Sequence, residues 1–449
     1  MDACRGTPGR RGRSRILGRC CRSLPLRYLY TLAMYLVTPL IVLRLALRGF
    51  RSRPYYWRWA ERFGFFKAPP DLAGSLWVHA VSVGEVNAAE PLIKALQRDY
   101  PDAPVVVTTV TPTGTARLQQ LFGDSVFHVY LPYDLPYAVS RFLAGVQPRL
   151  ALIVETEIWP NLYFACRRRR IPLMIVNARL SERSLRGYRP RPLRGMVRAA
   201  LGCVRLIAAQ SDADAARYRL IGAPPERVVV CGNLKYDMPV PQDAQEQGAR
   251  LREHWGSRRP VWMAASTHEG EEQAVLEAHL AVLKRMPDAL LLIAPRHPER
   301  FKPVEHAVRS LGFTAGTYGV DGRPALSNQV FVIDAMGQLM PFYAGAQLAF
   351  VGGSLVPIGG HNVLEPAALG TPVLVGPHTF NFEDITACLV EQGGAQRVPE
   401  AGALGDAVLG LLRDDAHRQE MGLAAQRVFE RERGAVGRVM RLIGEQLGQ

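Results

Sequence analysis

The stretch from 346 to 375, AQLAFVGGSLVPIGGHNVLEPAALGTPVLV, decides the fold. An apolar run at 347–351 has the length and composition of a buried strand. It leads into a glycine-rich loop, and the loop leads directly into a helix that begins near Asn362. A second apolar run, 372–375, follows at once. A strand, a short helix and a second strand in this order predict a parallel sheet.

The glycine-rich loop in this stretch predicts a ligand site. Glycines let backbone N–H groups approach a ligand, and a helix N-terminus offers unpaired donors to an anion. We expect the loop to hold a phosphate while Glu365, one turn into the helix, reaches toward hydroxyl groups. The alternative is a capping box with Asn362 as the N-cap and Glu365 at the third helical position. Four glycines and a histidine before the helix favour the ligand site, since a cap requires none of them.

The same alternation of apolar runs and helical stretches extends along most of the chain. The sequence predicts strands at 75–81, 104–109, 126–130, 150–155, 171–176 and 205–209, and again at 260–265, 289–294, 329–333, 347–351 and 372–375. The polar stretch 237–248 contains two prolines and separates the two sets as a linker. The pattern therefore predicts two α/β domains, each with a doubly wound parallel sheet, and ligands at the carboxyl ends of the strands.

Six blocks carry a resemblance to a known family. They are WVHAVSVGE at 77–85, ETEIWPN at 155–161, NARLSERS at 177–184, GNLKYD at 232–237, ASTHEGEE at 265–272 and APRHPERF at 294–301. Together with the glycine-rich loop, these blocks resemble the 3-deoxy-D-manno-octulosonic acid (Kdo) transferases, over roughly residues 70–430. The resemblance implies a GT-B fold, in which two Rossmann-like domains with parallel sheets face a cleft. It also implies inverting transfer of Kdo from CMP-Kdo to a lipid A precursor in lipopolysaccharide inner-core synthesis.

The division of the chain follows from these observations. We expect a basic membrane-anchor module at 1–62, an N-terminal acceptor domain at 63–237 and a C-terminal nucleotide-sugar donor domain at 238–449.

The net charge of +15 is concentrated at the N-terminus. Residues 1–62 contain 14 arginines and two acids, a net charge of +12, and the remaining 387 residues carry only +3. No nucleic-acid-binding motif accompanies this charge, so nucleic acid is not an expected partner. The seven cysteines have no zinc or disulfide spacing, which favours reduced thiols in the cytosol.

The N-terminal module predicts attachment to a membrane. Residues 28–43 are uncharged and mostly apolar, and this run is short for a spanning helix. Arginines crowd both of its ends, and Tyr55, Tyr56, Trp57 and Trp59 suit the headgroup level. We expect a helix inserted from the cytoplasmic face of the bacterial inner membrane, with both ends near an anionic surface. A single span, a signal peptide and a buried soluble helix are the alternatives.

Glu85 is the expected catalytic base. It follows the strand at 75–81 and begins a helix, so its carboxylate lies at the carboxyl end of a strand. Glycosyl transfer to a hydroxyl needs a group that takes the proton, and the helix N-terminus should keep the carboxylate ionised. The structural alternative is that Glu85 only complements the helix dipole. In the family, the glutamate of Ser-Val-Gly-Glu is the proposed base, which implies this role for Glu85.

Two further residues are expected to stabilise the transition state. Glu155 and Glu157 follow the strand at 150–155 and point the same way if the chain is extended. Such a carboxylate stabilises positive charge on the transferred sugar. Helix N-terminal acids before Trp159 are the alternative. The resemblance implies this role for Glu157 and for Lys235 of the Gly-Asn-Leu-Lys motif, with Glu155 left open.

Phosphate contacts are expected on an arginine-rich segment. Residues 167–194 contain ten arginines, and arginine suits bidentate phosphate binding. Arg167–Arg170 read better as a solvated face. The acceptor, a lipid A precursor with two phosphates, is expected at Arg179, Ser181, Arg183 and Ser184, which lie in a family block at a strand end.

The donor residues are expected at the strand ends of the second domain, where hydroxyls, an arginine and helix N-termini suit a nucleotide monophosphate. The resemblance implies that CMP binds to Ser266, Thr267, Pro295, Arg296, His297, Met336, Gly337, Gln338, Leu339, Asn362 and Glu365. At one position the chain departs from the family, which usually has Gly-Glu-Leu where this chain has Gly337-Gln338-Leu339. Gln338 can form hydrogen bonds at this position but cannot supply a charge.

No metal or other cofactor is expected. Asp212-Ala213-Asp214 follows Ser211 and reads better as a capped helix start than as a metal motif. The histidines at 268, 297, 361 and 378 are dispersed in the sequence and lack zinc spacing. Two other functions remain as alternatives: a membrane-associated GT-B enzyme that uses a UDP-sugar, and a non-catalytic lipid-phosphate-binding protein on the same scaffold.

Overall fold

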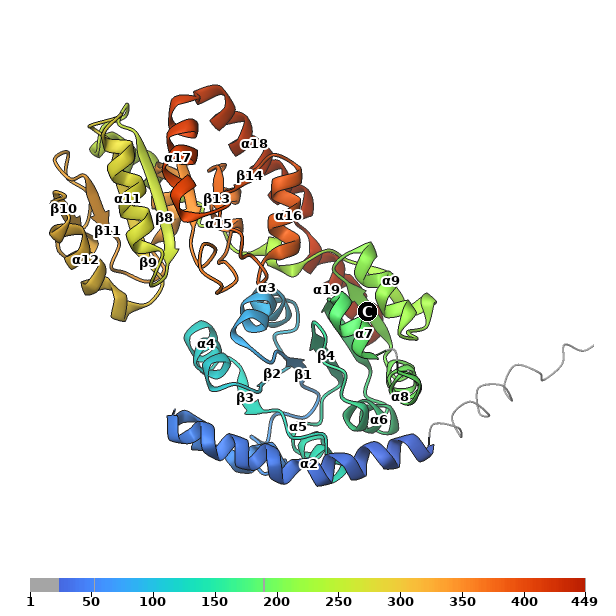
Figure 1. Cartoon of the computed structure of the whole chain (residues 1–449). Helices are drawn as coiled ribbons and strands as arrows, with labels where there is room; N and C mark the ends of the chain where they lie inside the picture. Colours follow the sequence, from blue (N-terminus) through green and yellow to red (C-terminus); the bar gives the residue numbers. More distant parts are fainter. Residues whose placement is uncertain (1–23, 52, 189, 449) are drawn as a thin grey trace, which may run out of the picture. The chain divides into compact units, whose positions relative to one another are not determined.

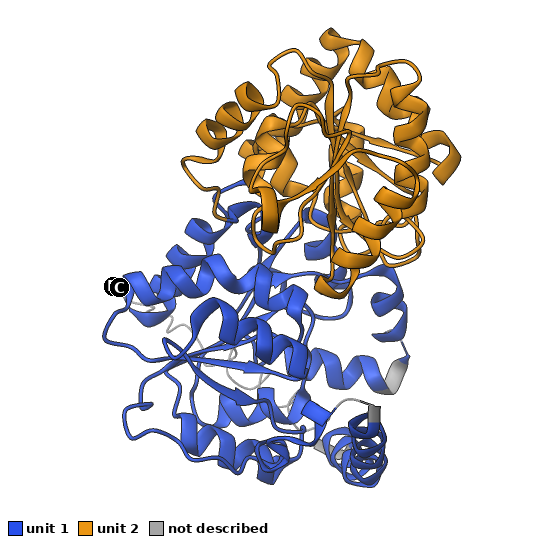
Figure 2. Ribbon diagram, turned by 90° about the vertical axis from the view of Figure 1, so that its left-hand side faces the viewer, with its two compact units in different colours: residues 1–238, 433–449 blue, residues 239–432 orange. Residues whose placement is uncertain are grey.

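The computed structural model describes residues 24–51, 53–188 and 190–448 of the chain. Cys4, Cys20, Cys21 and the arginines before residue 23 lie outside the described residues. The chain forms two compact units (Figure 2): unit 1 comprises Met1–Met238 and Arg433–Gln449, and unit 2 comprises Pro239–Glu432.

Unit 1 is built on a seven-stranded parallel sheet with the order β3-β2-β1-β4-β5-β6-β7 (Figure 1). The strands are β1 (Leu76–His79), β2 (Val105–Thr109), β3 (Phe127–Tyr130), β4 (Leu150–Val154), β5 (Leu173–Ala178), β6 (Leu206–Ala209) and β7 (Val228–Val230). Alternate residues of the central strands enter two separate apolar cores. Both faces of the sheet are therefore covered, as the near-continuous apolar strands require.

The helices of unit 1 divide between these two cores. They are α3 (Val83–Asp99), α4 (Pro112–Phe122), α5 (Pro136–Val146), α6 (Pro160–Arg168), α7 (Glu182–Tyr188), α8 (Arg191–Leu201), α9 (Asp212–Leu220) and α19 (Ala435–Leu447). Helices α5 to α9 pack on one face, and α3, α4 and α19 pack on the other.

The last helix changes the predicted domain boundary. The sequence analysis assigns 238–449 to the second domain, whereas the structure places α19 in unit 1. The apolar side chains of Ala435, Val439 and Ile443 are fully buried in the same core as Val86 and Leu92 of α3. Burial of this apolar stripe fixes α19 against α3, the helix that carries Glu85.

The predicted membrane helix is α2 (Leu24–Arg51), which extends past the apolar run to include Arg44 and Arg48. It is followed by the short helices η2 (Arg53–Tyr56) and η3 (Trp59–Phe63). One face of α2 packs against α6 and α8 of unit 1. Residues 26–50 are long and apolar enough to cross a membrane.

Polar contacts fasten both ends of α2 to unit 1. Near its start, the Tyr30 hydroxyl donates to the carboxylate of buried Asp134 at 2.9 Å, and the Thr31 hydroxyl donates to Asn161 Oδ1 at 3.1 Å. Beyond its end, Arg58 donates to the carbonyl oxygen of His128 at 2.7 Å, next to the sheet. The helix therefore lies along unit 1, as the lower edge of Figure 1 shows.

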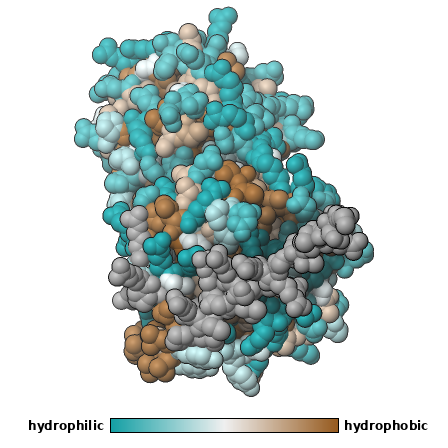
Figure 3. Space-filling model, turned by 90° about the vertical axis from the view of Figure 1, so that its right-hand side faces the viewer, coloured by the Kyte–Doolittle hydropathy of each residue, from teal (hydrophilic) through white to brown (hydrophobic). Residues whose placement is uncertain are grey.

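The outward face of α2 is a continuous apolar stripe. Leu29, Leu32, Leu36, Leu40, Leu43, Leu47 and Phe50 are between 55% and 81% exposed. Their spacing of three and four residues places them on one side of the helix. Figure 3 shows apolar surface at the lower edge of the molecule, where α2 lies. An exposed stripe of this length marks an interaction surface.

Unit 2 has a second seven-stranded parallel sheet with the order β10-β11-β9-β8-β12-β13-β14. The strands are β8 (Val261–Thr267), β9 (Leu290–Pro295), β10 (Ala315–Thr317), β11 (Val330–Val332), β12 (Leu348–Val351), β13 (Val373–Val375) and β14 (Ala395–Arg397). The helices are α10 (Ala244–His254), α11 (Glu272–Leu283), α12 (Phe301–Ser310), α13 (Tyr318–Asp321), α14 (Leu339–Gly345), α15 (Leu364–Ala368), α16 (Glu383–Glu391), α17 (Leu404–Arg413) and α18 (Asp415–Glu432). The central strands β9, β8 and β12 bring their carboxyl ends together.

Candidate active site

Glu85 lies at the carboxyl end of the central strand β1 in unit 1. Ser82 caps α3, and its hydroxyl oxygen accepts the N–H of Glu85 at 3.5 Å. The Glu85 carboxylate accepts the Val81 N–H at 2.7 Å and the Ser82 hydroxyl at 3.3 Å. The side chain therefore also completes a cap of the helix, which is the structural alternative considered for it.

Glu85 has a strongly raised pKa. Burial is the largest cause and, together with the charges of Glu155 and Glu157, raises the pKa of its carboxyl to about 8, against the lowering effect of the hydrogen bonds from Val81 and Ser82. The sequence analysis expected the helix N-terminus to keep this carboxylate ionised. That expectation is wrong for the unliganded protein because loss of solvation outweighs the helix dipole. A cap does not require such a pKa, whereas a general base works best with a pKa near the operating pH.

Glu155 and Glu157 follow β4, the neighbour of β1 in the sheet. An extended chain was predicted here. The structure has a turn instead, because Glu155 has a positive φ of 60°. The hydroxyls of Tyr218 and Tyr163 hold this turn by donating to the carbonyl oxygens of Glu155 and Glu157, at 3.1 and 2.6 Å. Burial raises the pKa of Glu157 to about 7, with a further contribution from Glu155. Three carboxyl groups thus share one edge of the sheet.

Lys235 is brought to this edge by Asn177. Lys235 lies in η5 (Leu234–Asp237), a turn that packs against α3. Asn177, at the end of β5, is buried with a positive φ of 52°, and its Oδ1 accepts the N–H of Leu234 at 3.0 Å. Its Nδ2 is buried without a hydrogen-bond partner. Sequence reasoning did not single out Asn177 as a site residue, although it stands in a family block.

The expected acceptor residues lie at the end of β5 and the start of α7. The Ser181 hydroxyl oxygen accepts the Ser184 N–H at 3.1 Å, and the two hydroxyls are 3.0 Å apart, so this serine pair caps α7. Arg183 is exposed and Arg179 half-buried. Nearby, the Ser211 hydroxyl accepts the Asp214 N–H at 3.2 Å, and Asp214 accepts the Leu180 N–H at 2.8 Å. The predicted helix start at 211–214 is confirmed.

In unit 2, the ends of β8 and β9 bring five expected donor residues together. Ser266 has a positive φ of 56° and interrupts the pairing of β8 with β9. Thr267 is fully buried, and its hydroxyl has no hydrogen-bond partner. The N–H of Arg296 donates to the carbonyl oxygen of Thr267 at 2.9 Å. Pro295 ends β9 and His297 follows on the surface, so the cluster lies at the carboxyl edge of the sheet.

The glycine-rich loop after β12 already holds an anion of the protein itself. The buried carboxylate of Glu271 accepts the N–H groups of Gly353, Ser354 and Leu355 at 2.7, 3.0 and 2.8 Å. It also accepts the His268 N–H at 3.0 Å. The expectation that this loop holds a phosphate is therefore wrong for these three N–H groups. An internal carboxylate satisfies them and fixes the loop.

Substitution Glu271→Gln should lower the free energy of unfolding by at least about 3 kcal/mol. Each carboxylate oxygen accepts two N–H groups, so an amide nitrogen in either position loses two charged hydrogen bonds of about 1.5–3 kcal/mol each. Urea denaturation measures the effect. Glu269→Gln is the control, because Glu269 is exposed in the same loop and makes only a 3.5 Å ion pair with Arg300. Equal stability of the two variants would contradict the role of Glu271.

Asn362 and Glu365 contact each other at the start of α15. The Asn362 amide donates to the Glu365 carboxylate at 3.1 Å, and Asn362 Oδ1 accepts the Leu364 N–H at 3.1 Å. The residue at the N-cap is Val363, whose side chain makes no cap hydrogen bond. The capping box with Asn362 at the N-cap is therefore not formed as the alternative required.

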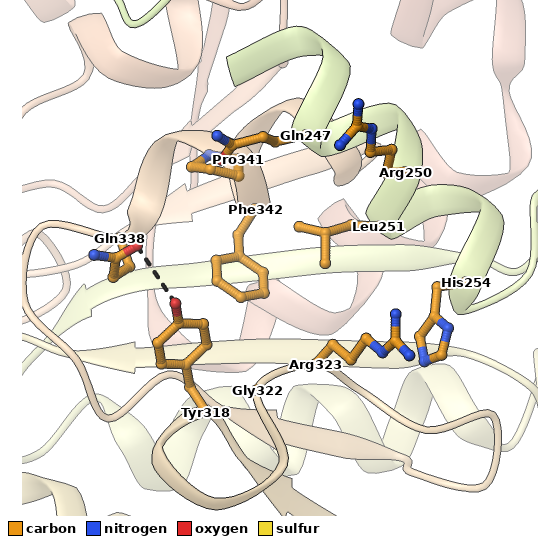
Figure 4. Close-up of a pocket in the computed structure, with 10 residues that line it drawn as sticks. All are labelled: Gln247, Arg250, Leu251, His254, Tyr318, Gly322, Arg323, Gln338, Pro341 and Phe342. Carbon is orange, nitrogen blue, oxygen red and sulfur yellow. Dashed lines mark hydrogen bonds between the residues drawn. The ribbon is translucent and has the colours of Figure 1, made fainter. Parts of the chain in front are cut away.

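Gln338 borders a cavity of about 260 Å³ in unit 2 (Figure 4). The Tyr318 hydroxyl donates to Gln338 Oε1 at 3.5 Å. The rings of Tyr318 and Phe342 form an apolar wall, and Arg250, Arg323 and His254 line the rest of the cavity. Met336 is exposed, and Gly337, with a φ of 77°, turns the chain into α14 ahead of Leu339.

Within the described part of the chain, no group of three or more His, Cys, Asp or Glu side chains has an arrangement suited to a metal ion. The histidines that are dispersed in the sequence are nevertheless not dispersed in space. His268, His297 and His361 lie together at the carboxyl edge of the unit 2 sheet.

Comparisons with known proteins identify the family. The family model described as 3-deoxy-D-manno-octulosonic-acid transferase (kdotransferase) matches residues 57–238. The 3-deoxy-D-manno-octulosonic acid transferase of Haemophilus influenzae is 43% identical over 93% of this chain and 98% of its own length. The chain belongs to the Kdo transferase family. The Kdo transferase of Bordetella pertussis is 38% identical over 94% of this chain and its full length.

Solved structures place this Kdo transferase among the GT-B proteins. The crystal structure of UDP-GlcNAc 2-epimerase from Neisseria meningitidis bound to UDP-GlcNAc has a TM-score of 0.54, with 16% identity. It covers 83% of this chain and 99% of that chain. At this identity the likeness concerns the fold alone. The protein is a glycosyltransferase with the GT-B combination of two parallel α/β units.

Proposed function

We propose that this protein transfers Kdo from CMP-Kdo to a hydroxyl group of a lipid A precursor, with inversion at the sugar. The observation that carries the proposal is Glu85, a half-buried carboxyl with a pKa of about 8 at the end of the central strand β1. The membership of the protein in the Kdo transferase family supports Kdo as the transferred sugar. We assign the acceptor and the base to residues 63–237 and the donor to unit 2.

In this mechanism Glu85 removes the proton of the acceptor hydroxyl as the oxygen attacks the sugar. Burial makes its ionised form a strong base, and the same burial makes that form scarce at neutral pH. Glu157 stabilises positive charge that develops on the sugar, and Lys235 stabilises negative charge on the leaving phosphate. The phosphates of the acceptor contact Arg179 and Arg183, and the hydroxyls of Ser181 and Ser184 donate to them.

The pH dependence of kcat/KM should report the ionisation of Glu85. Since the base form is required, kcat/KM should rise about tenfold per pH unit at low pH and level off above a midpoint near 8. The carboxyls interact, so the midpoint belongs to the group of three. Glu157→Gln should shift the midpoint downward by removing a neighbouring negative charge. Initial rates between pH 5.5 and 9.5 at saturating CMP-Kdo, extrapolated to low acceptor concentration, give kcat/KM for the acceptor and measure both effects. A flat profile would contradict the role of Glu85.

For the donor, we propose that CMP binds Ser266, Thr267, Arg296, His297 and the segment 336–339, with Asn362 and Glu365 on the ribose hydroxyls. The unpartnered hydroxyl of buried Thr267 favours a polar ligand at this edge. Gln338 supplies hydrogen bonds without a charge.

Glu365→Ala should weaken CMP binding by roughly tenfold, the value of one charged hydrogen bond to a sugar hydroxyl. Asn362→Ala should act in the same direction, because the Asn362 amide orients the Glu365 carboxylate. Calorimetric titration with CMP measures the affinity, and thermal melts run alongside. Glu305→Ala, an exposed carboxylate on α12, is the control. Unchanged CMP affinity in a destabilised Glu365→Ala variant would limit Glu365 to its structural contact with Asn362 at the start of α15.

We propose that the protein acts at the cytoplasmic face of the bacterial inner membrane with α2 lying in the membrane surface. Contacts on both sides of α2 hold it along unit 1, and its outward leucines would enter the lipid. A helix of 28 residues that lies along its own domain has both ends on one side of the bilayer. Arg44 and Arg48 are exposed and suit an anionic headgroup layer.

One assay tests the function as a whole. Purified full-length protein in detergent is incubated with CMP-Kdo and a lipid A precursor, and the products are identified by mass. Addition of one or more Kdo units is the expected result. A UDP-sugar takes the place of CMP-Kdo in a parallel reaction. Transfer from the UDP-sugar alone would replace the proposed donor, and binding of the precursor without any transfer would point to a non-catalytic role.

A further inference from the structure

Three imidazole rings and a guanidinium group converge at the carboxyl edge of the unit 2 sheet. His268 follows β8, Arg296 and His297 follow β9, and His361 lies in the glycine-rich loop after β12. The rings of His268 and His361 lie nearly parallel, with centroids 4.9 Å apart and planes at 5°, and meet through their Nε2 edges. The ring of His297 meets His268 edge-on at 5.2 Å. Segments far apart in the sequence therefore build one compact basic cluster.

The loop backbone is shaped to seat this cluster. Gly353 has a φ of 68°, and a Cβ atom there would lie 3.0 Å from the His361 ring and 3.5 Å from the His268 ring. Glu271 holds the N–H groups of both Gly353 and His268, so the loop and the first histidine share one fixed anchor. The position of the rings is thus determined by buried structure.

The two Nε2 atoms of the His268–His361 pair share one proton and can bind a second. Their Nε2 atoms are 2.6 Å apart, a hydrogen bond in which one neutral ring donates and the other accepts. If both Nε2 atoms carried protons, two N–H groups would face each other and the bond would break. Two such N–H groups would then be available to an anion placed between the rings.

The cation next to the pair is Arg296, which acts on both rings, as the imidazole of His297 does. Glu272 is the acid that acts on His268. Glu272 is itself paired with Arg300 at 2.9 Å. Burial, followed by the neighbouring imidazoles and Arg296, lowers the pKa of His361 to about 3 and lowers that of His268 below its usual value. Without an anion, the pair is therefore neutral at physiological pH.

We propose that His268, His297, His361 and Arg296 form a binding site for an anionic group of the sugar nucleotide, and that this group binds together with one proton taken up by the His268–His361 pair. The proposal rests on the proposed function, and it adds a subsite to the donor half. The solvent supplies the proton, the hydrogen bond between the rings breaks, and each Nε2–H donates to an oxygen of the anion. The negative charge of the ligand offsets the added positive charge of the ring.

The donor carries two anionic groups of this kind, its phosphate and the carboxylate of its acidic sugar. Both accept two N–H groups in the same way. Titration with CMP, which has only the phosphate, and with CMP-Kdo, which has both, distinguishes them. Proton uptake on binding of CMP assigns the cluster to the phosphate. Proton uptake on binding of CMP-Kdo but not of CMP assigns the cluster to the carboxylate.

Calorimetry provides the test. The full chain carries the substitution Glu85→Gln, which removes both turnover and the titration of Glu85. It is titrated at pH 7.5 in two buffers with different ionisation enthalpies, and the difference in heat gives the number of protons taken up. Linkage predicts uptake approaching one proton per ligand, and an affinity that falls up to about tenfold per pH unit between 6.5 and 8.5.

His361→Gln and His268→Gln, each added to that background, should abolish the uptake and flatten the pH dependence, since an amide cannot take up the proton. His306→Gln, an exposed histidine on α12, is the matched control and should leave both unchanged. Binding without proton uptake, or uptake that persists in both cluster variants, would overturn the proposal. Failure to bind either CMP or CMP-Kdo would contradict the proposed function instead.

Discussion

Glu85→Gln is expected to lower the rate of Kdo transfer by 10²- to 10⁴-fold, which is the usual contribution of a general base. The substitution keeps the shape of the side chain and an acceptor oxygen. Glutamine can therefore preserve the contacts to the Val81 N–H and to Ser82, and it serves a capping box as well as glutamate does. Initial rates with saturating CMP-Kdo and acceptor measure the loss.

The stability of the same variant separates catalysis from capping. A carboxyl whose pKa is raised in the folded state favours folding at pH values below its unfolded pKa, and that contribution is lost as pH rises through the folded value. The free energy of unfolding of the wild type should therefore decrease between about pH 4.5 and 8 on account of Glu85. Glu85→Gln removes this dependence and should be at least as stable as the wild type at pH 8.

Glu90→Gln is the control on the same helix, because Glu90 forms a surface ion pair with Lys94 at 2.7 Å. It should change neither the transfer rate nor the pH dependence. If Glu85→Gln retains more than about a tenth of wild-type turnover, the base lies elsewhere. If it unfolds at pH 8, Glu85 is needed for the structure and not only for the reaction.

The double substitution Leu36→Asp and Leu40→Asp should release the protein from membranes. Each exposed leucine that enters lipid contributes about 1.5–3 kcal/mol, so the pair accounts for roughly a 10²- to 10⁴-fold change in partitioning. Both side chains point away from unit 1, with exposures of 68% and 65%, so the fold should be unaffected. Flotation with vesicles that contain anionic phospholipid, followed by a high-salt wash, measures the bound fraction.

Leu220→Asp with Val320→Asp provides the matched control, since these residues are exposed on other surfaces, at 56% and 85%. The control should remain bound to the vesicles. Retention of the Leu36→Asp, Leu40→Asp variant after the salt wash would show that α2 does not carry the attachment. The contacts of Tyr30 and Thr31 favour this test over deletion of the helix, which would expose Asp134 and Asn161.

The central strands were predictable from the sequence, and three edge strands were not. The eleven predicted strands correspond to β1–β6, β8, β9 and β11–β13. The missed strands β7, β10 and β14 have three residues each, and all lie at the edge of a sheet. Only one side of an edge strand is paired, so its sequence needs neither length nor a full apolar run. Apolar runs therefore reveal all the central strands and the four-residue edge strand β3, and they miss the three shortest edge strands.

The candidate site shows the same division. Glu85, Glu157 and the strand-end residues of unit 2 were visible as polar residues directly after apolar runs. Glu271 acts through three hydrogen bonds to backbone groups 82 to 84 residues away, and Asn177 through one to a backbone group 57 residues away. No local pattern reveals such partners. The raised pKa of Glu85 was missed for a related reason. The helix dipole is visible in the sequence, whereas burial and the charges of Glu155 and Glu157 exist only after folding.

The placement of α19 has a consequence for the order of events during synthesis. Unit 2 is a continuous segment, so it can fold as soon as residue 432 has left the ribosome. Unit 1 then still lacks the helix that covers Val86, Ala89 and Leu92 on α3. The core-facing side of the Glu85 helix thus stays uncovered until α19 has emerged. A released chain truncated after residue 432 should contain a protease-resistant unit 2 and an easily cleaved α3.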